Sequence, residues 1–338
     1  MITISLCMIV KNEEAVLARC LASYNPVVDE IIIIDTGSTD KTKEIARNYT
    51  NQVYDFTWTG SFSDARNYSF SKATKEYIFC ADADEVLDEE NQKLFLLMKE
   101  NLLPEIDIVQ MYYGNQFSHN TIYNYDKEYR PKLYKRIRHF IWEGSIHEAV
   151  RLNPVIYDSD ITITHLPQGN HAARDLAAFE RMETAQLYFD SRLHNIYAKE
   201  LFIAGEDEHF IRAIPTFLRT MEDTERSVDE LKEACCILAR AYRIKKDTPN
   251  FFKFTTKAIT MNGCSEVCME LGDYYLSLGD LQEAIIWYYN AAFETECILK
   301  LSTKTKDSLL ALAKCYETLG DLEMASTYQQ QALSNENV

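Results

Sequence analysis

EIIIIDTGSTD, residues 30–40, joins an apolar run to a polar turn. The four isoleucines leave no polar face, so this strand must be covered on both sides, as strands of a parallel sheet are. Asp35 then stands at the carboxyl end of the strand, and we interpret Ser38, Thr39 and Asp40 as caps of the next helix. The stretch predicts an α/β domain with a buried, mainly parallel sheet.

The flanking segments repeat this alternation of strand and helix. Strand-like and helix-like stretches follow one another at 3–10, 13–24, 30–35, 40–49, 51–58, 61–73 and 77–84. Such an order predicts a parallel sheet with helices on both faces, and ligands of these sheets bind beyond the carboxyl ends of the strands. Four short segments lie at those ends, namely 11–14, 35–40, 58–64 and 82–84.

The pattern changes after residue 100. Short β-prone runs between 105 and 165 predict a mixed or antiparallel extension of the sheet, and the chain then reads as helical from Pro167 onward. Segments 269–292 and 310–333 resemble each other and share small residues, tyrosines and a Gly-Asp turn, at offsets typical of tetratricopeptide helix pairs. An ordinary helical tail is the alternative.

Composition limits the classes of partner. The formal net charge is −17, which argues against nucleic acid or an anionic membrane surface as a ligand. The sequence contains no run of about 18 apolar residues, the length that a membrane-spanning helix needs. The first residues are interpreted as a strand. The nine cysteines are an odd number without a zinc pattern, so we expect reduced, mostly buried thiols in a cytoplasmic protein.

Acidic residues follow the strand-like run YIFC. Asp82 and Asp84 have the i, i+2 spacing with which two carboxylates beyond a strand can hold a divalent cation that bridges phosphate oxygens. The chain has only 10 glycines and no GxGxxG or P-loop, so a diphosphate would need such a counter-charge. Arg66 could add a bidentate contact or make a surface salt bridge. Glu85 and Asp88 are interpreted as helix-start or solvent-facing charges.

Four blocks occur in a characteristic order: SLCMIVKNEE, IIIIDTGSTDKT, FSDARNYSFSKA and YIFCADADEVL. They resemble the nucleotide-sugar half of a family-2 glycosyltransferase with the GT-A fold, over about residues 3–165. With the repeat-like tail, the chain is similar to bacterial enzymes that glycosylate peptides or proteins, such as sublancin-type S-glycosyltransferases and flagellin glycosyltransferases. The resemblance implies an α/β GT-A domain, a Rossmann-like mixed and mainly parallel sheet, followed by an all-α tetratricopeptide-like domain.

The resemblance also implies domain limits. We expect a GT-A domain at 1–166 (nucleotide-binding half 1–100, acceptor half 101–166), a connecting helix at 167–195 and helical repeats at 196–338.

The resemblance further implies roles for single residues. It places the uracil and ribose of a UDP-sugar against the residues after the first two strands, which are Val10, Asn12, Glu13 and Asp35. It assigns the nucleotide or diphosphate to Arg66, the ribose and metal to Asp82, and ligation of Mn²⁺ or Mg²⁺ to Asp84; Ala83, between these two acids, belongs to the donor-binding set.

The catalytic base is expected in WEGSIHEAV (142–150), a variant of the acidic motif typical of the family. We choose Glu148, with Glu143 second. His147 and His165 are candidates for a further metal ligand or structural histidines, and His165 ranks first because it ends a strand-like run.

One basic run stands out in this acidic chain. It consists of Arg130, Lys132, Lys135, Arg136 and Arg138. It could close over the diphosphate, with Arg130 as a donor-binding residue, or it could be the solvated face of a hairpin.

The sequence therefore predicts a metal-dependent, inverting glycosyltransferase that moves a sugar from a UDP-sugar to a peptide or protein side chain. The helical tail would select the acceptor and could also form a homodimer. Two alternatives stay open: an enzyme acting on a cell-surface glycan or lipopolysaccharide core, and a catalytically inactive helical-repeat interaction protein.

Overall fold

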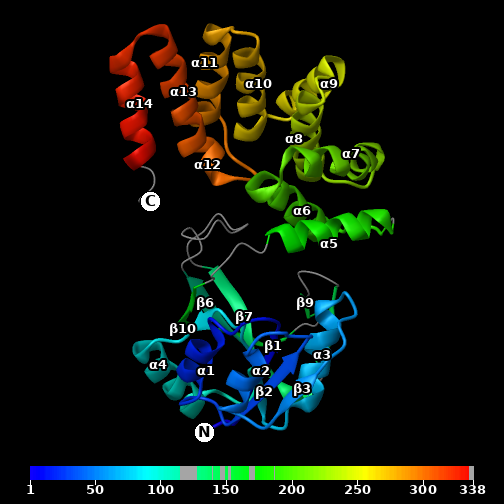
Figure 1. Ribbon diagram of the computed structural model, residues 1–338, viewed down its shortest axis with the longest axis vertical. Helices are drawn as coiled ribbons and strands as arrows, with labels where there is room; N and C mark the ends of the chain where they lie inside the picture. Colours follow the sequence, from blue (N-terminus) through cyan, green and yellow to red (C-terminus); the bar gives the residue numbers. More distant parts are fainter. Residues whose placement is uncertain are drawn as a thin grey trace. The chain divides into compact units, whose positions relative to one another are not determined.

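The computed structural model describes residues 1–114, 128–138, 140–144, 149–150, 154–166, 172–185 and 187–334. The chain divides into two compact units, Met1–Asn170 and His171–Val338. The first is an α/β unit and the second is helical throughout its described part, which confirms the predicted fold class (Figure 1).

An eight-stranded sheet organises the first unit. Its strands, in spatial order, are β3 (Val53–Asp55), β2 (Glu30–Asp35), β1 (Ile4–Val10), β4 (Tyr77–Cys80), β7 (Glu128–Lys135), β6 (Ile108–Gly114), β10 (Ile156–His165) and β5 (Glu85–Val86). The first four are parallel, β7 is antiparallel to both of its neighbours, β6 and β10 are parallel, and β5 is antiparallel to β10. The sheet is therefore mixed and mainly parallel.

Both faces of the sheet are buried, as the isoleucine run predicts. Ile31 and Ile33 pack in one core with residues of helices α1 (Leu17–Tyr24) and α4 (Glu89–Asn101). Ile32 and Ile34 face the other side and pack with residues of α3 (Phe62–Lys72). Successive strand residues point to opposite faces, so a strand without polar positions needs both layers.

The remaining described elements of the first unit are α2 (Thr42–Arg47), the 3-10 turn η2 (Arg136–Arg138), and the short strands β8 (Trp142–Glu143) and β9 (Ala149–Val150), which pair antiparallel. Asp88 caps α4, because its side chain accepts a hydrogen bond from the backbone N–H of Asn91 at 2.8 Å. The interpretation of Asp88 as a helix-start charge is therefore confirmed.

The second unit is a succession of helices. They are α5 (Ala172–Thr184), α6 (Ser191–Ala204), α7 (Asp207–Glu222), α8 (Val228–Ile244), α9 (Thr248–Thr260), α10 (Ser265–Ser277), α11 (Leu281–Tyr289), the π-turn η3 (Asn290–Glu294), α12 (Leu301–Lys304), α13 (Lys306–Leu319) and α14 (Leu322–Ser334). Among the described residues, none of the helices combines the length and apolar content that crossing a membrane requires.

The repeated Gly-Asp turn joins the helices of each pair. Gly279 and Gly320 have φ of 78° and 83°, a left-handed conformation that glycine adopts without a steric penalty. Asp280 and Asp321 then accept a backbone N–H of the next helix, from Glu283 and from Met324, both at 3.1 Å. The motif thus ends one helix and begins the next, which explains its recurrence in both repeats.

Gly272 sits in α10 against the ring of Tyr288, and a Cβ at this position would overlap that ring. We expect Gly272→Ala to lower the free energy of unfolding by about 1–3 kcal/mol, although alanine is the better helix former. Urea unfolding followed by circular dichroism measures this. Ser277→Ala, at the exposed end of the same helix, is the control, and an equal or higher stability of Gly272→Ala would contradict the close packing.

Candidate active site

The loops after β1 and β2 are tied to each other at the carboxyl edge of the sheet. Asn12, at φ 57°, donates its backbone N–H to the Ser38 hydroxyl at 2.9 Å, and its side-chain oxygen accepts from the N–H of Thr39 at 2.8 Å. The Glu13 N–H donates to the hydroxyl of Thr42 at 2.7 Å. These bonds hold the predicted donor-binding segment in place.

The interpretation of Ser38 and Thr39 as helix caps is wrong. Helix α2 begins at Thr42, and Lys41 at its N-cap offers no side-chain cap. Asp40 accepts from the N–H of Thr42 at 3.0 Å, so it alone of the three serves the helix start. The local pattern suggested caps, but Ser38 and Thr39 instead form hydrogen bonds with Asn12, on the loop after β1.

Asp35 is buried at the end of β2. One carboxylate oxygen, Oδ1, accepts from the backbone N–H groups of Gly37 and Ser38 at 3.0 and 2.9 Å, and lies 3.6 Å from Lys43 Nζ. The other oxygen, Oδ2, is buried and has no hydrogen-bond partner among the described residues. Leaving a buried acceptor unsatisfied is costly, so this atom is suited to receive an N–H or hydroxyl from a ligand.

Val10 contributes in a different way. Its side chain is in the core, and its carbonyl accepts from the N–H of Thr36 at 3.0 Å. Ala83 is also buried. The donor-binding roles predicted for these two residues stay predictions.

Asp82 lies beyond β4 with its side chain 57% exposed, and its Oδ1 is 3.8 Å from Arg66 Nη2. Desolvation acts to raise the pKa of Asp82, but Arg66, Lys132, His165 and Arg130 together lower that pKa by more, so it lies below its ordinary value. These neighbouring basic groups thus favour the anionic form of Asp82, although the whole chain is acidic.

Arg66 is held by a residue that the sequence did not single out. Its guanidinium lies 4.8 Å from the ring centroid of Trp142. The side-chain amide of Asn67 both donates to the Trp142 carbonyl and accepts from its N–H, at 3.0 and 2.8 Å. The first turns of α3 thereby fix the β8 segment next to Arg66.

Asp84 and His165 meet in space. His165 Nε2 lies 3.0 Å from Asp84 Oδ2, and both side chains are largely buried. The carbonyl of Asp84 accepts from the N–H of Leu166 at 2.9 Å, which fixes the acidic turn against the end of β10. Of the two histidines suggested as metal ligands, His165 is thus placed at the acidic pair. His147 lies outside the described residues.

The predicted base, Glu148, also lies outside the described residues. Glu143 is exposed on β8, where it pairs with Ala149 of β9.

Glu85 is not the solvent-facing charge that the sequence suggested. Its side chain is fully buried, and Oε1 forms an ion pair with Lys132 Nζ at 2.5 Å. Burial raises the pKa of Glu85, and Lys132 lowers it by less, so the pKa lies above its ordinary value. The sequence around Glu85 could not reveal this partner, because Lys132 lies 47 residues further along the chain, on β7.

The basic run does not act as one cluster. Arg130 is at the site edge, stacked 3.8 Å from the centroid of Tyr113 and paired with Glu128 at 2.6 Å. Lys135, at the other end of β7, instead lies opposite Tyr77 in the strand register. Tyr77 begins β4, so Lys135 is away from the acidic turn that follows β4.

The other two bases of the run also bind elsewhere. Arg136 Nε donates to the carbonyl of Lys75 at 2.6 Å, and Arg138 lies 3.3 Å from Asp107. The idea that all five bases close over a diphosphate is therefore wrong, because a strand carries its two ends to opposite edges of the sheet.

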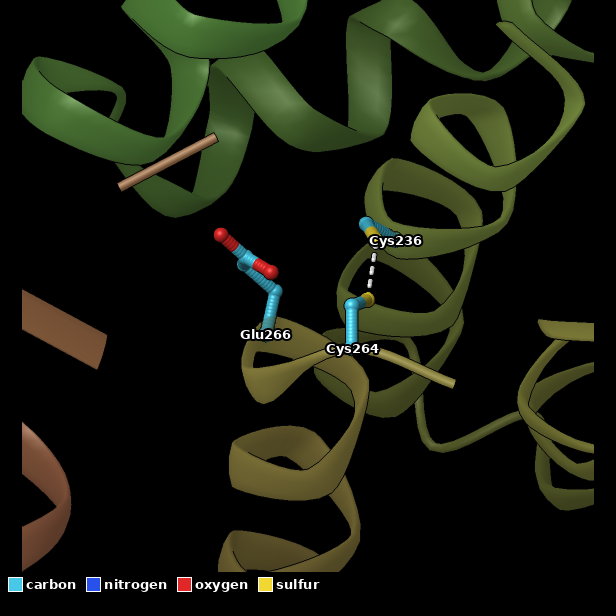
Figure 2. Close-up of side chains that lie close together, drawn as sticks. All are labelled: Cys236, Cys264 and Glu266. Atoms are coloured by element: carbon cyan, nitrogen blue, oxygen red, sulfur yellow. Dashed lines mark hydrogen bonds between the residues drawn. The ribbon is translucent and has the colours of Figure 1, made fainter. Parts of the chain in front are cut away.

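A second group of possible metal ligands lies in the helical unit: Cys236, Cys264 and Glu266, all buried, with ligand atoms within 4.8 Å of one another. Figure 2 shows the two thiols facing each other, with sulfurs 3.3 Å apart, and the carboxylate directed elsewhere. Glu266 accepts from the backbone N–H groups of residues 298–300, at 3.0, 2.7 and 3.0 Å for the nearer oxygen. Its carboxylate thus anchors the segment that precedes α12.

The first unit thus combines a mainly parallel sheet with acidic residues and an arginine beyond its central strands. Residues 5–168 match the family described as Glycosyl transferase family 2, and residues 265–292 and 307–337 match the Tetratricopeptide repeat family. The chain therefore contains a glycosyltransferase family-2 domain, followed by tetratricopeptide repeats. This confirms the family resemblance and the repeats predicted from the sequence.

Curated relatives cover parts of the chain. The present chain is 46% identical over 87 residues (26% of its length) to a TPR repeat-containing protein of Synechococcus elongatus. It is 36% identical over 92 residues (27% of its length) to the SPbeta prophage-derived glycosyltransferase SunS of Bacillus subtilis. The match spans 22% of the length of each relative.

Solved structures show a distant likeness. Glucosyl-3-phosphoglycerate synthase of Mycobacterium tuberculosis, determined with Mn²⁺ and UDP-glucose, aligns with a TM-score of 0.42 and 14% identity, over 56% of this chain and 81% of that one.

Proposed function

We propose that this chain is a metal-dependent, inverting glycosyltransferase that transfers a sugar from a UDP-sugar to a peptide or protein side chain. The observation that supports this most directly is the meeting of Asp84 and His165 at 3.0 Å, beside the Asp82–Arg66 pair at the carboxyl edge of the sheet. Carboxylate, imidazole and guanidinium groups at one edge suit a cation and a diphosphate.

The nucleotide would bind against the two tied loops. The unsatisfied Oδ2 of Asp35 would accept the N–H of the uracil or a ribose hydroxyl, and the backbone from Val10 to Glu13 would line the same pocket. Because Asp35 Oδ1 is already held by two backbone N–H groups, its carboxylate needs no rearrangement to do this.

The donor atoms fit Mn²⁺ or Mg²⁺. Asp84 and His165 would be the protein ligands, and Asp82 would lie beside them with its charge shared with Arg66. Two protein ligands suffice for such a cation, since phosphate oxygens and water complete the shell. When bound, the cation would neutralise charge that develops on the leaving diphosphate.

The residues of the chain would do the rest. Arg66, oriented by the Trp142 ring, would bind the diphosphate and stabilise it as the bond to the sugar breaks. Arg130, with its guanidinium against Tyr113, could add a second contact. Glu148 would take the proton from the acceptor on the opposite face of the sugar, so that one in-line displacement inverts the anomeric carbon.

The acceptor is assigned to a peptide or protein because of the repeats. Stacked tetratricopeptide pairs present extended surfaces that suit a peptide. A glycan or lipopolysaccharide core is the competing acceptor.

Release of UDP tests the donor and the metal together. We expect the full chain to release UDP from at least one common UDP-sugar with Mn²⁺, and EDTA to remove this activity, because the diphosphate then lacks its counter-charge. Mass spectrometry of candidate peptides and glycans incubated with the productive donor identifies the acceptor. UDP release that EDTA leaves unchanged would contradict metal dependence, and sugar found on glycans alone would contradict the peptide acceptor.

A further inference from the structure

We propose that Glu85 and Lys132 are positioning residues for the candidate metal site, because they hold the turn between Asp82 and Glu85 in the conformation that presents Asp84. This inference rests on the proposed function, since it concerns the carboxylate assigned there to the metal.

The turn is closed by two hydrogen bonds between its ends. The backbone N–H of Glu85 donates to the carbonyl of Asp82 at 3.2 Å, and the N–H of Asp82 donates to the side-chain oxygen Oε2 of Glu85, also at 3.2 Å. Asp84 lies inside this closed turn. The Glu85 carboxylate is therefore a structural part of the turn, and its rotation would release the Asp82 end.

Lys132 fixes the orientation of that carboxylate. Its Nζ is 2.5 Å from Oε1 of Glu85, which leaves Oε2 aimed at the N–H of Asp82. The ammonium also lies 5.1 Å from the ring centroid of Tyr113, and that ring is 5.2 Å from the ring of His165. Glu85 and His165 themselves are paired residues of β5 and β10. One ion pair thus links the acidic turn to both the β7 strand and the histidine.

Stability alone does not account for a buried ion pair at this place. Its side chains are 0% and 9% exposed, so both charges have lost most of their water. Replacing a whole buried pair with apolar residues is often neutral or stabilising, whereas removing one partner leaves an unpaired charge. Apolar residues could not supply an acceptor for the Asp82 N–H. This acceptor, which positions the turn, is therefore the reason we infer for the buried pair.

The chain offers a matched control in the Asp29–Lys99 pair. Lys99 Nζ is 2.6 Å from Asp29 Oδ2, and that oxygen also accepts from the backbone N–H of Ile4, at 2.8 Å. The Lys99 side chain is 5% exposed and the Asp29 side chain 34%, so this control pair is less buried than the Glu85–Lys132 pair. Ile4 begins β1, so this pair lies at the amino edge of the same sheet, away from the site.

The test compares double variants. We expect Glu85→Leu/Lys132→Met to bind Mn²⁺ alone roughly 10- to 100-fold more weakly than wild type, the usual effect of losing a residue that orients a ligand. Electron paramagnetic resonance of free Mn²⁺ measures the affinity, and the thermal midpoint reports folding. Glu85→Gln/Lys132→Met keeps an acceptor for the Asp82 N–H without a charge but loses the lysine that orients it, so we expect a loss of affinity smaller than tenfold.

The control double variant, Asp29→Leu/Lys99→Met, should retain wild-type Mn²⁺ affinity whatever its thermal midpoint. Wild-type affinity in Glu85→Leu/Lys132→Met, or equal losses in both Glu85 double variants, would overturn the inference. If the leucine variant does not fold, the glutamine variant decides, because a tenfold or larger loss there contradicts positioning through the Asp82 N–H.

Asp84→Ala separates this inference from the proposed function. If Asp84→Ala loses Mn²⁺ while Glu85→Leu/Lys132→Met keeps it, the metal site stands and the positioning role is wrong. If Asp84→Ala binds Mn²⁺ as tightly as wild type, the metal assignment fails and the positioning role fails with it.

Discussion

Asp84→Ala is expected to lower metal-dependent UDP release by at least roughly a thousandfold, because a metal contributes several kcal/mol to stabilising a leaving diphosphate. The Asp84 side chain is largely buried, and its Oδ2 lies 3.0 Å from Nε2 of His165. UDP release with Mn²⁺ is the measurement, and circular dichroism checks that the fold persists.

Asp88→Ala is the matched control. Asp88 is an exposed acid four positions further along the chain, and it only caps α4. Its loss should cost about 1 kcal/mol of stability and leave the rate of UDP release intact. Wild-type turnover by Asp84→Ala would remove the metal-site proposal, whereas equal losses in both variants would indicate a folding defect.

Glu148→Gln is expected to slow sugar transfer by about 10²- to 10⁴-fold, the usual contribution of a general base, while binding of the donor stays unchanged. Glutamine has nearly the same shape but cannot take a proton from the acceptor. Single-turnover transfer to the acceptor measures the chemical step, and calorimetry with UDP and Mn²⁺ measures binding.

Glu143→Gln is the comparison for the base, because Glu143 is the second candidate and lies on β8 opposite Ala149. A large loss of transfer in Glu143→Gln alone would assign the base to Glu143. Normal transfer in both variants would place the base elsewhere in the chain.

Much of the site could be anticipated because strand ends are visible in a sequence. Asp35 and Asp82 follow apolar runs, and parallel strands bring such ends to one edge of the sheet. The roles assigned to these residues, to Asp84 and to Glu148 stay predictions. Their neighbours could not be anticipated in the same way. Trp142 is an aromatic residue in the segment predicted to hold the base, and nothing else in the sequence indicates that it lies beside Arg66.

Local pattern by itself determined the α/β class, the two-sided burial of the isoleucine strand and the Gly-Asp turns of the repeats. Each of these depends on residues that are close in the chain, where periodicity and backbone preference act directly. Even there, Ser38 and Thr39 were misread, since their partner is Asn12, on the neighbouring loop.

The tertiary structure decided which charges meet. Asp84 and His165 are 81 residues apart, and Glu85 and Lys132 are 47 apart. Their contacts depend on the order β4-β7-β6-β10-β5, in which antiparallel β7 and the short β5 bring distant segments to one edge of the sheet. Strand order is set by the packing of the whole sheet, so an acid that resembled a solvent-facing charge, Glu85, is instead buried beneath the site.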